Sequence, residues 1–424
     1  EQIEAAEIIR QAMIEHKHAV IEAGTGVGKS LAYLIPAIYS GRKVIVATSG
    51  KALQDQLFRA DLPFLQAALP IGFSFAVLKG RGNYICLRKL EEEAAQQNLL
   101  GRTHDFALLL AWLEATETGD IEEMATAITG VLRGAVTSDR DECLGKDCPQ
   151  RNCFYERAKA RAEDVRILVV NHTLLALDCA LRSRTDGFVS VLPDRDCVVC
   201  DEAHSLEETF TRAFEVEISS TGIPTLLRSK YLSECHVEGS ALAATLVAGE
   251  ELFTYLSKMS DERSLLAGIV QPVPERLAAL AEALALRLHE VARQVGRGNP
   301  YAGNSPQGKV IENYRKRVAA TAETVASIVF EDQSQVLYVE KRQGKYQSIT
   351  ALKRCPISVA DDLRDSLFDK WPTICCSATL ATSSSGDSQF EYFKGRVGLA
   401  SADPLELRVG SPFDYKRHCL LYLP

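Results

Sequence analysis

The feature that most constrains the fold of this chain is a glycine-rich segment near its start, residues 22–30, which reads EAGTGVGKS. The apolar run Ala19–Ala23 leads into the glycines, and the segment 31–35 continues after them as an apolar helix. A strand, a glycine loop and a helix in this order form a cradle whose backbone N–H groups bind phosphate. The segment therefore predicts an α/β unit that binds a nucleoside triphosphate.

The residues of this cradle have predicted roles in binding phosphate and metal. Lys29 is expected to reach the β- and γ-phosphates, and Ser30 is expected to bind Mg²⁺. The predicted nucleotide contacts are Ala23, Gly24, Thr25, Gly26, Val27, Gly28, Lys29 and Ser30.

A second motif, DEAH at residues 201–204, follows the apolar run Cys197–Cys200. Its acids therefore emerge at the carboxyl end of a strand, where open α/β sheets bind ligands. In phosphate-loop enzymes, one acid there holds Mg²⁺ and its neighbour orients the attacking water. We predict that Asp201 binds the metal, that Glu202 activates water, and that His204 links this site to the rest of the protein. The predicted catalytic set is Lys29, Asp201, Glu202 and His204.

Six sequence stretches, taken together, resemble a known protein family far more specifically than any one of them does alone. In chain order they are residues 22–30, 48–57 (TSGKALQDQL), 169–175 (VVNHTLL), 201–204, 377–380 (SATL) and 411–415 (SPFDY). With these motifs the chain resembles the superfamily 2 DNA helicases of the XPD/DinG type, and most closely the bacterial DinG/YoaA branch. The motifs run in family order across nearly the whole chain.

The resemblance implies an ATP-dependent enzyme that unwinds duplex DNA by moving along one strand, from 5′ to 3′, in repair or replication. The implied partners are single-stranded and forked DNA and a replication or repair protein. The resemblance also implies that Gln2 reads adenine, and that Ser377 and Thr379 couple hydrolysis to movement. At the end of a strand, Thr48 and Ser49 are expected to hold DNA phosphates.

The chain has twelve cysteines. In a cytosolic protein, where thiols stay reduced, these predict metal ligands or buried side chains rather than disulfides. Three of them lie in the polar segment 143–153, and a fourth lies upstream in a basic stretch. Four thiolates at this spacing suit zinc and an iron–sulfur cluster about equally. The resemblance implies a 4Fe-4S cluster held by Cys86, Cys143, Cys148 and Cys153.

Short apolar runs alternate with longer helical segments, which predicts a mostly parallel sheet with helices on both faces. The predicted strands are 19–23, 43–48, 73–78, 166–170, 197–200 and 373–377. This α/β pattern corresponds to a RecA-like lobe, interrupted by a cysteine-ligated cluster domain and a mainly helical arch domain. The predicted domains are lobe 1 in three parts (1–80, 162–205 and 353–409), the cluster domain (81–161), the arch (206–352) and the start of a second lobe (410–424).

The formal net charge of −8 excludes a uniformly basic DNA-coating protein, so DNA must bind in a local groove. Two basic stretches that contain aromatic residues, 79–89 and 151–161, are candidates, and Arg81 is a predicted DNA contact. The segment 335–349 predicts two strands about a turn at 342–344. Charged residues at that tip, Lys341, Arg342 and Lys345, are interpreted by default as solvated.

No apolar run reaches the roughly 18 residues of a membrane span, and no secretory signal precedes the first motif, so a cytoplasmic protein without membrane contacts is expected. About 45 residues follow the SATL motif. We therefore expect the second lobe, with its arginine finger, to be absent, and this chain alone to hydrolyse ATP poorly. Three alternatives stay open: a translocating ATPase that does not separate strands, a redox-sensing DNA-binding module, and a zinc protein with a relic phosphate loop.

Overall fold

The computed structural model describes residues 1–100, 103–139, 142–262, 268–301, 305–344, 348–382 and 389–411. The chain forms two compact units. The first consists of Glu1–Gly80, Phe154–Phe214 and Ser358–Pro424, and the second of Arg81–Cys153 and Glu215–Ile357. Each helix in the described part of the chain is too short or too polar to cross a membrane.

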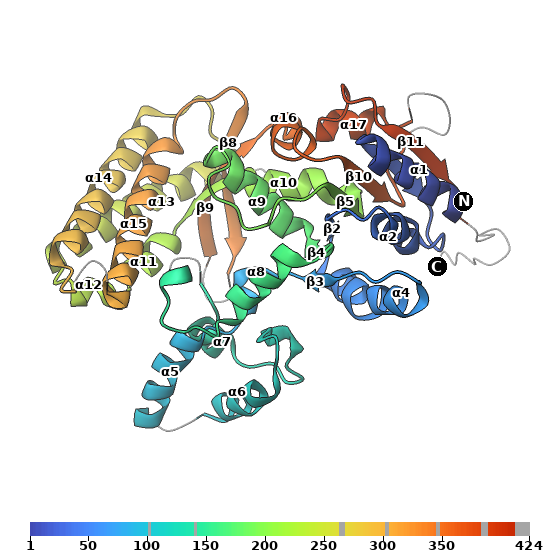
Figure 1. Ribbon diagram of the computed structural model, residues 1–424. Helices are drawn as coiled ribbons and strands as arrows, with labels where there is room; N and C mark the ends of the chain where they lie inside the picture. The colour runs from blue at the N-terminus through green and yellow to red at the C-terminus, as the bar shows by residue number, and fades with distance from the viewer. Residues whose placement is uncertain are drawn as a thin grey trace, which may run out of the picture. The chain divides into compact units, whose positions relative to one another are not determined.

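The first unit is built on a parallel sheet, in which the described residues form seven strands (Figure 1). Their order across the sheet is β11-β1-β10-β5-β2-β4-β3. The strands are β1 (Ala19–Ala23), β2 (Val44–Thr48), β3 (Phe75–Val77), β4 (Ile167–Asn171), β5 (Cys197–Asp201), β10 (Thr373–Ser377) and β11 (Leu405–Val409). The predicted α/β class with a mostly parallel sheet is confirmed.

Both faces of this sheet are covered, because every residue of β1, β2, β5 and β10 is buried. Alternate strand residues share one core with side chains of α1, α2 and α4, while α9 packs on β2 and β4. The helical elements of this unit are α1 (Gln2–Glu15), α2 (Lys29–Tyr39), α3 (Lys51–Gln56), η1 (Leu57–Asp61), α4 (Leu62–Ala68), α8 (Phe154–Asp164), α9 (His172–Arg184), η5 (Ala203–Ser205), α10 (Leu206–Phe214), α16 (Ala360–Leu363), η6 (Arg364–Phe368) and α17 (Glu391–Val397).

All six predicted strands exist, with ends that shift by up to two residues. The edge strand β11 was not predicted. Its sequence LELRV is short and half polar, and its first four residues are only partly buried or exposed, so it lacks the continuous apolar run of a central strand. Pairing with β1 along its whole length makes it a strand.

The second unit combines long helices with a small antiparallel sheet. In α14, apolar residues return at helical spacing, and those such as Leu277, Leu284 and Leu288 are fully buried in the core of the unit. The helical elements of this unit are η2 (Arg81–Asn83), α5 (Leu87–Leu100), α6 (His104–Ala115), η3 (Ile121–Glu123), α7 (Gly130–Val136), η4 (Gly145–Asp147), α11 (Gly222–Leu226), α12 (Lys230–Glu234), α13 (Gly239–Glu262), α14 (Glu275–Gly298) and α15 (Pro306–Ser327).

The sheet of the second unit has the strand order β6-β9-β8-β7 in the described residues. Its strands are β6 (Val216–Ser219), β7 (Gly268–Ile269), β8 (Gln335–Gln343) and β9 (Ser348–Pro356). The predicted hairpin is confirmed as β8 and β9, but the predicted turn is too early. Arg342 and Gln343 pair with Ile349 and Ser348 across the strands, and Lys345 lies outside the described residues. The guanidinium of Arg342 also pairs with Glu217 at 2.7 Å.

The cysteine-containing segment and the long helices share one core. Leu144, between two of the cysteines, is buried in the same apolar cluster as the helices α13 to α15, and Cys148 packs against that cluster. Helix α8 belongs to the first unit, so the contact-defined boundary falls after Cys153 instead of residue 161. The division of the second unit into a cluster domain and an arch domain stays a prediction.

Candidate functional site: the phosphate loop and the acidic turn

The glycine loop connects β1 to α2 in the first unit. Gly26 and Gly28 both have φ of 84°, in the left-handed region that glycine adopts at little cost. A Cβ at Gly28 would also lie 2.2 Å from the Gln2 side-chain nitrogen. Because α2 begins at Lys29, the unpaired N–H groups of its first turn lie at this loop. The backbone therefore has the form of an anion cradle.

The side chain of Gln2 lies against the same loop. Its Nε2 atom donates a hydrogen bond to the carbonyl oxygen of Gly28 at 3.1 Å. This places the predicted adenine-reading residue beside the phosphate cradle, although 26 residues separate the two positions. The contact to adenine itself stays a prediction.

The acidic turn follows β5, whose last residue is Asp201. Asp201 is buried, and its Oδ1 and Oδ2 atoms accept hydrogen bonds from the Glu202 N–H at 3.0 Å and the Tyr33 hydroxyl at 3.2 Å. Burial and the neighbouring charge of Glu202 raise the pKa of Asp201 to about 6, against the opposing effect of Lys29. A cation close to this carboxylate would favour its ionised form.

Lys29 and Glu202 bring the two halves of the predicted site together. The Lys29 Nζ atom lies 3.0 Å from Glu202 Oε1, and both side chains are mostly buried. Glu202 has a left-handed backbone with φ of 55°, which is uncommon outside glycine. Such conformations persist where the surrounding structure imposes them, and they concentrate at functional sites.

The SATL motif reaches the same carboxylate from β10. The hydroxyl of Ser377 lies 3.3 Å from Glu202 Oε2 and 2.8 Å from His204 Nδ1. The N–H of Thr379 points at the Ser377 hydroxyl at 3.4 Å. His204 was predicted to link the site to the rest of the protein, and Ser377 was predicted to couple hydrolysis to movement. The two residues contact each other and Glu202.

Sequence reasoning missed Tyr33, which joins the two metal-binding candidates. Its hydroxyl lies within hydrogen-bonding reach of the side chains of Ser30 and Asp201. Tyr33 follows Lys29 by four residues and Ser30 by three, so helical spacing alone puts it on their face of α2. The desolvation of its phenol and the charge of Asp201 raise the pKa of Tyr33 well above its ordinary value.

The VVNH motif is connected to the acidic turn by hydrogen bonds through Ser205. Asn171 caps α9, because its Oδ1 atom accepts the N–H of Leu174 at 2.8 Å. The next residue, His172, is buried and contacts the Ser205 hydroxyl through Nδ1 at 3.0 Å. That hydroxyl donates to the carbonyl oxygen of Glu202 at 3.1 Å. Burial lowers the pKa of His172 to about 4, so its ring is neutral at physiological pH.

The predicted DNA contacts differ in accessibility. Thr48 is fully buried at the end of β2, whereas the next residue, Ser49, is exposed. The Ser49 side chain is therefore open to a phosphate, whereas the Thr48 hydroxyl is enclosed, and the contact of both residues with DNA stays a prediction. Arg81 lies in the short turn η2 of the second unit and is partly exposed. Its contact with DNA stays a prediction.

The basic stretch 79–89 is less available than its sequence indicates. Lys79 is buried and pairs with Asp55 at 3.1 Å. In the second unit, Arg88 pairs with Glu92, and Lys89 pairs with Glu142 at 3.2 Å. Acids outside the basic run neutralise these charges. The positive local groove predicted from this stretch is therefore weaker than a count of its lysines and arginines implies.

Two of the four predicted cluster ligands lie near each other. Cys86 precedes α5, and Cys143 is near enough to raise the Cys86 pKa, although burial is the larger cause. The side chains of Arg88 and Lys89 both bind Glu142, which holds the start of α5 beside the segment that contains Cys143. The Cys143 sulfur also accepts the N–H of Gly145 at 3.4 Å, as thiolate ligands in metal sites commonly do.

The described residues contain no group of three or more His, Cys, Asp or Glu side chains placed to hold one metal ion. The four cysteines nevertheless carry thiols that are only partly buried, and all belong to the second unit. Their chemistry therefore fits a cluster. Cys148 and Cys153 are not gathered with Cys86 and Cys143 into a single ligand set.

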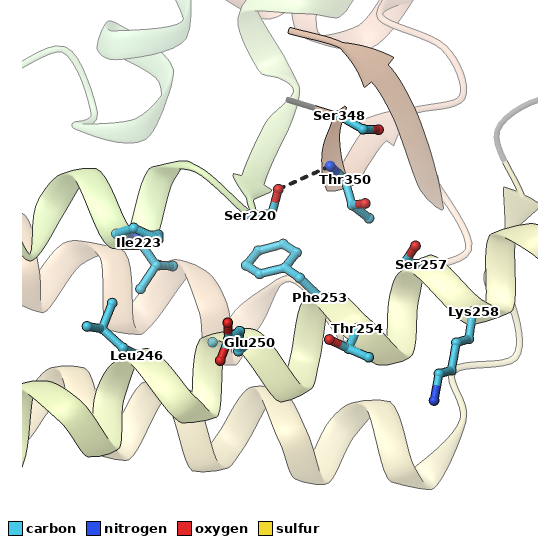
Figure 2. A pocket seen from close by; sticks show the side chains of 12 residues that line it. Ser220, Ile223, Leu246, Glu250, Phe253, Thr254, Ser257, Lys258, Ser348 and Thr350 are labelled. Carbon is cyan, nitrogen blue, oxygen red and sulfur yellow. Dashed lines mark hydrogen bonds between the residues drawn. The ribbon is translucent and has the colours of Figure 1, made fainter. Parts of the chain in front are cut away.

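A pocket of about 690 Å³ lies in the second unit, away from these motifs in sequence. Figure 2 shows Phe253 and Glu250 of α13 on one side, with Thr350 of β9 and Ser220 on the other. The Thr350 N–H donates to the Ser220 hydroxyl at 3.2 Å, which fixes this wall. The residues that line it belong neither to the phosphate loop nor to the acidic turn.

Comparisons with known proteins agree with the geometry. Residues 2–124 match the family model described as DEAD/DEAH box helicase. The chain is 31% identical over 442 residues to the ATP-dependent DNA helicase YoaA of Escherichia coli (strain K12), covering 99% of this chain and 65% of the relative. It is 30% identical over 460 residues to the ATP-dependent helicase DinG of Mycobacterium tuberculosis (strain ATCC 25177 / H37Ra), covering 100% and 65%.

The chain thus spans about two thirds of the length of these relatives. A solved XPD helicase is also similar, with 13% sequence identity and a TM-score of 0.47, over 96% of this chain and 61% of that one. The chain therefore carries a DEAD/DEAH box helicase domain, and the proteins named YoaA and DinG are its homologues.

Proposed function

We propose that the protein is an ATP-dependent DNA helicase, and that the first unit of this chain is its first motor lobe. The observation that carries the proposal is the 3.0 Å contact between Lys29 of the phosphate loop and Glu202 of the DEAH turn. Two motifs that are separately expected at a nucleotide are thus combined in one site. The names of the relatives in Escherichia coli and Mycobacterium tuberculosis support the same activity.

In the proposed reaction, the loop N–H groups and Lys29 bind the phosphates of ATP. Ser30 and Asp201, which share the Tyr33 hydroxyl, would hold Mg²⁺. Glu202 would orient the attacking water. Because Ser377 and His204 contact Glu202, a change at this carboxylate on hydrolysis reaches β10 directly.

We further propose that Cys86, Cys143, Cys148 and Cys153 hold a 4Fe-4S cluster. The support is their thiol chemistry, their partial exposure and the proximity of Cys86 to Cys143. A bound cluster would cross-link the segments that carry these cysteines. Unwinding from 5′ to 3′, a role in repair or replication, forked DNA as substrate and a cytoplasmic location belong to the same proposal and rest on the resemblance.

The proposal is tested with the full-length protein on duplexes that carry either a 5′ or a 3′ single-stranded tail. We expect DNA-stimulated ATP hydrolysis and unwinding of the 5′-tailed duplex. Lys29→Ala should abolish both while leaving the fold intact, because Lys29 supplies charge at the phosphates. Unwinding that does not depend on a tail, or that survives this substitution, contradicts the helicase proposal.

Two outcomes of this experiment identify the alternatives. ATP hydrolysis stimulated by DNA without strand separation indicates a translocase. DNA binding that changes with cluster oxidation and is unaffected by Lys29→Ala indicates a redox-sensing module. Iron and sulfide analysis of the purified protein separates either from a zinc protein.

A further inference from the structure

The acid at the start of the glycine-rich segment, Glu22, is not part of the phosphate cradle. It lies on β1, and its side chain is 10% exposed. Glu22 stands opposite Ser377 of β10 on one side and Arg408 of β11 on the other. An acid buried within a parallel sheet is costly unless it is paired and hydrogen-bonded. The groups that bind the Glu22 carboxylate therefore indicate what this residue does.

Both oxygens of the Glu22 carboxylate are bound, one to the segment that follows β10 and the other to β11. Oε2 accepts the backbone N–H groups of Leu380 at 2.7 Å and Ala381 at 2.6 Å. Oε1 lies 2.8 Å from Nε of Arg408. Hydrogen bonds to an ionised acceptor are shorter and stronger than neutral ones. One side chain on β1 thus holds the backbone directly after the SATL motif and the side chain of Arg408 on β11.

The phosphate loop is also tied to the chain that leaves β11. The N–H of Gly24 points to the carbonyl oxygen of Val409 at 3.4 Å, and the Ser411 hydroxyl donates to the carbonyl oxygen of Thr25 at 3.0 Å. A Cβ at Gly24 would lie 3.0 Å from Ser411 atoms, which is closer than a side chain tolerates without a shift. The last residue of β11 and the residue Ser411 beyond it therefore contact the first residues of the loop.

We propose that Glu22 is a positioning residue that fixes the turn after β10 relative to the phosphate loop. The turn in question carries Leu380 and Ala381, and it directly follows Ser377, which contacts Glu202 and His204. By holding this turn, Glu22 keeps the Ser377 hydroxyl at the water-activating carboxylate. It touches neither the phosphates nor the water in this assignment, and acts through Ser377.

The effect of Glu22 on ATPase kinetics rests on the proposed function. Its effect on the structure around Leu380 and Ala381 does not depend on any reaction. When the acceptor is removed, the amides of Leu380 and Ala381 lose their partner. Their hydrogen exchange should then become about 10- to 100-fold faster, the range expected for the loss of hydrogen bonds to a charged group. Exchange in β2 and β4, which Glu22 does not contact, should stay unchanged.

Two variants of the full-length protein test the assignment. Glu22→Ala removes every contact. Glu22→Gln keeps the shape and one acceptor oxygen, but it turns an uncharged amide toward Arg408. The matched control is Glu406→Gln on β11, which makes the same chemical change at an acid that pairs with Lys394 at 2.7 Å. Hydrogen-exchange mass spectrometry reads the peptide that spans residues 378–382.

Steady-state kinetics give the second readout. Since Glu22 is not a phosphate ligand in this assignment, the KM for ATP should stay within about threefold of the wild-type value in Glu22→Gln, while kcat falls about tenfold or more. The Glu406→Gln control should change neither. A loss confined to KM would place Glu22 in nucleotide binding and overturn the proposal.

Unchanged exchange at residues 380 and 381 in both Glu22 variants also overturns the positioning role. So does an equal rise in exchange across the whole sheet, because Glu22 would then stabilise the fold in general. If the wild-type protein hydrolyses no ATP, the proposed function fails. The exchange experiment still decides the Glu22 assignment in that case.

Discussion

The phosphate-loop site of the first unit and the cysteine segment of the second unit were both expected to bind cofactors, but the structure organises them differently. In the first unit, Lys29 and Glu202 approach to 3.0 Å across 173 residues of sequence. In the second, Cys86 and Cys143 lie near each other, and the described residues gather no larger set of ligands. Protein contacts alone build the first site.

The difference follows from the elements that carry the residues. The ends of parallel strands meet at one edge of a sheet, so hydrogen bonds between strands fix residues that follow β1, β5 and β10. Cys143, Cys148 and Cys153 lie outside helices and strands, where few backbone bonds set their positions. Metal binding commonly supplies the remaining order at such sites.

The largest expected effect concerns Glu202. Glu202→Gln keeps the shape of the side chain but removes the charge that faces Lys29 and, in our proposal, the base that orients water. ATP hydrolysis by the full-length protein should fall by about 10²- to 10⁴-fold, with ATP binding retained. Glu207→Gln, which disrupts an ion pair to Arg396 in the same unit, is the control. A Glu202→Gln enzyme within threefold of the wild-type rate would remove Glu202 from the chemistry.

The buried charge of Asp201 predicts a pH-dependent stability. The folded state raises the pKa of Asp201 from 3.8 to about 6, so protonation of this carboxyl favours the folded state. The stability that it contributes is fully present below about pH 4 and is lost as the pH rises through 6. Asp201→Asn should therefore unfold at higher denaturant than the wild type without Mg²⁺. The gain should be about 3 kcal/mol above pH 7 and roughly half of that at pH 5.

Chemical denaturation at pH 5, 6 and 8 with a chelator present measures this gain. Asp403→Asn, at an exposed position, controls for the substitution itself. A gain for Asp201→Asn that does not grow between pH 5 and pH 8 would show that the carboxylate is not destabilised by burial. Such a result would weaken the contrast between the phosphate-loop site, which is preformed and strained, and the cysteine segment, which needs its metal.

The cysteine segment is tested by its metal content. In anaerobically purified full-length protein, Cys86→Ser or Cys143→Ser should lower iron and sulfide at least tenfold and remove visible absorption, because each cluster iron needs its thiolate. Cys355→Ser is the matched control, at a partly buried free cysteine of the same unit. Stoichiometric zinc in the wild-type protein would replace the cluster assignment, and no bound metal would reject both.

The smallest effect concerns the cap of α9. Asn171→Ala removes the acceptor for the Leu174 N–H and should lower the free energy of unfolding by about 1 kcal/mol. Asn171→Ser keeps an acceptor and should recover most of that loss. Thermal or denaturant unfolding measures both variants. Equal stability of all three proteins would mean that this motif residue does not stabilise α9.

Much of the first unit could be predicted because its signals are local. Continuous apolar runs predicted the six strands, and the glycines themselves predicted the loop, in which Gly26 and Gly28 adopt a left-handed backbone. The edge strand β11 escaped because LELRV has no continuous apolar run and depends on its pairing with β1. Thr48 was assigned to DNA from its strand end, but only packing reveals that its side chain is fully buried.

The amino-acid sequence by itself determined the phosphate loop, the acidic turn and the candidate thiol ligands, since each depends on residue types at short spacing. The tertiary structure decided which of these meet. Strand order places β10 between β1 and β5, and this alone brings Glu22, Ser377 and Glu202 into one chain of contacts. Parallel strands are joined through long crossovers, so no local pattern encodes their neighbours.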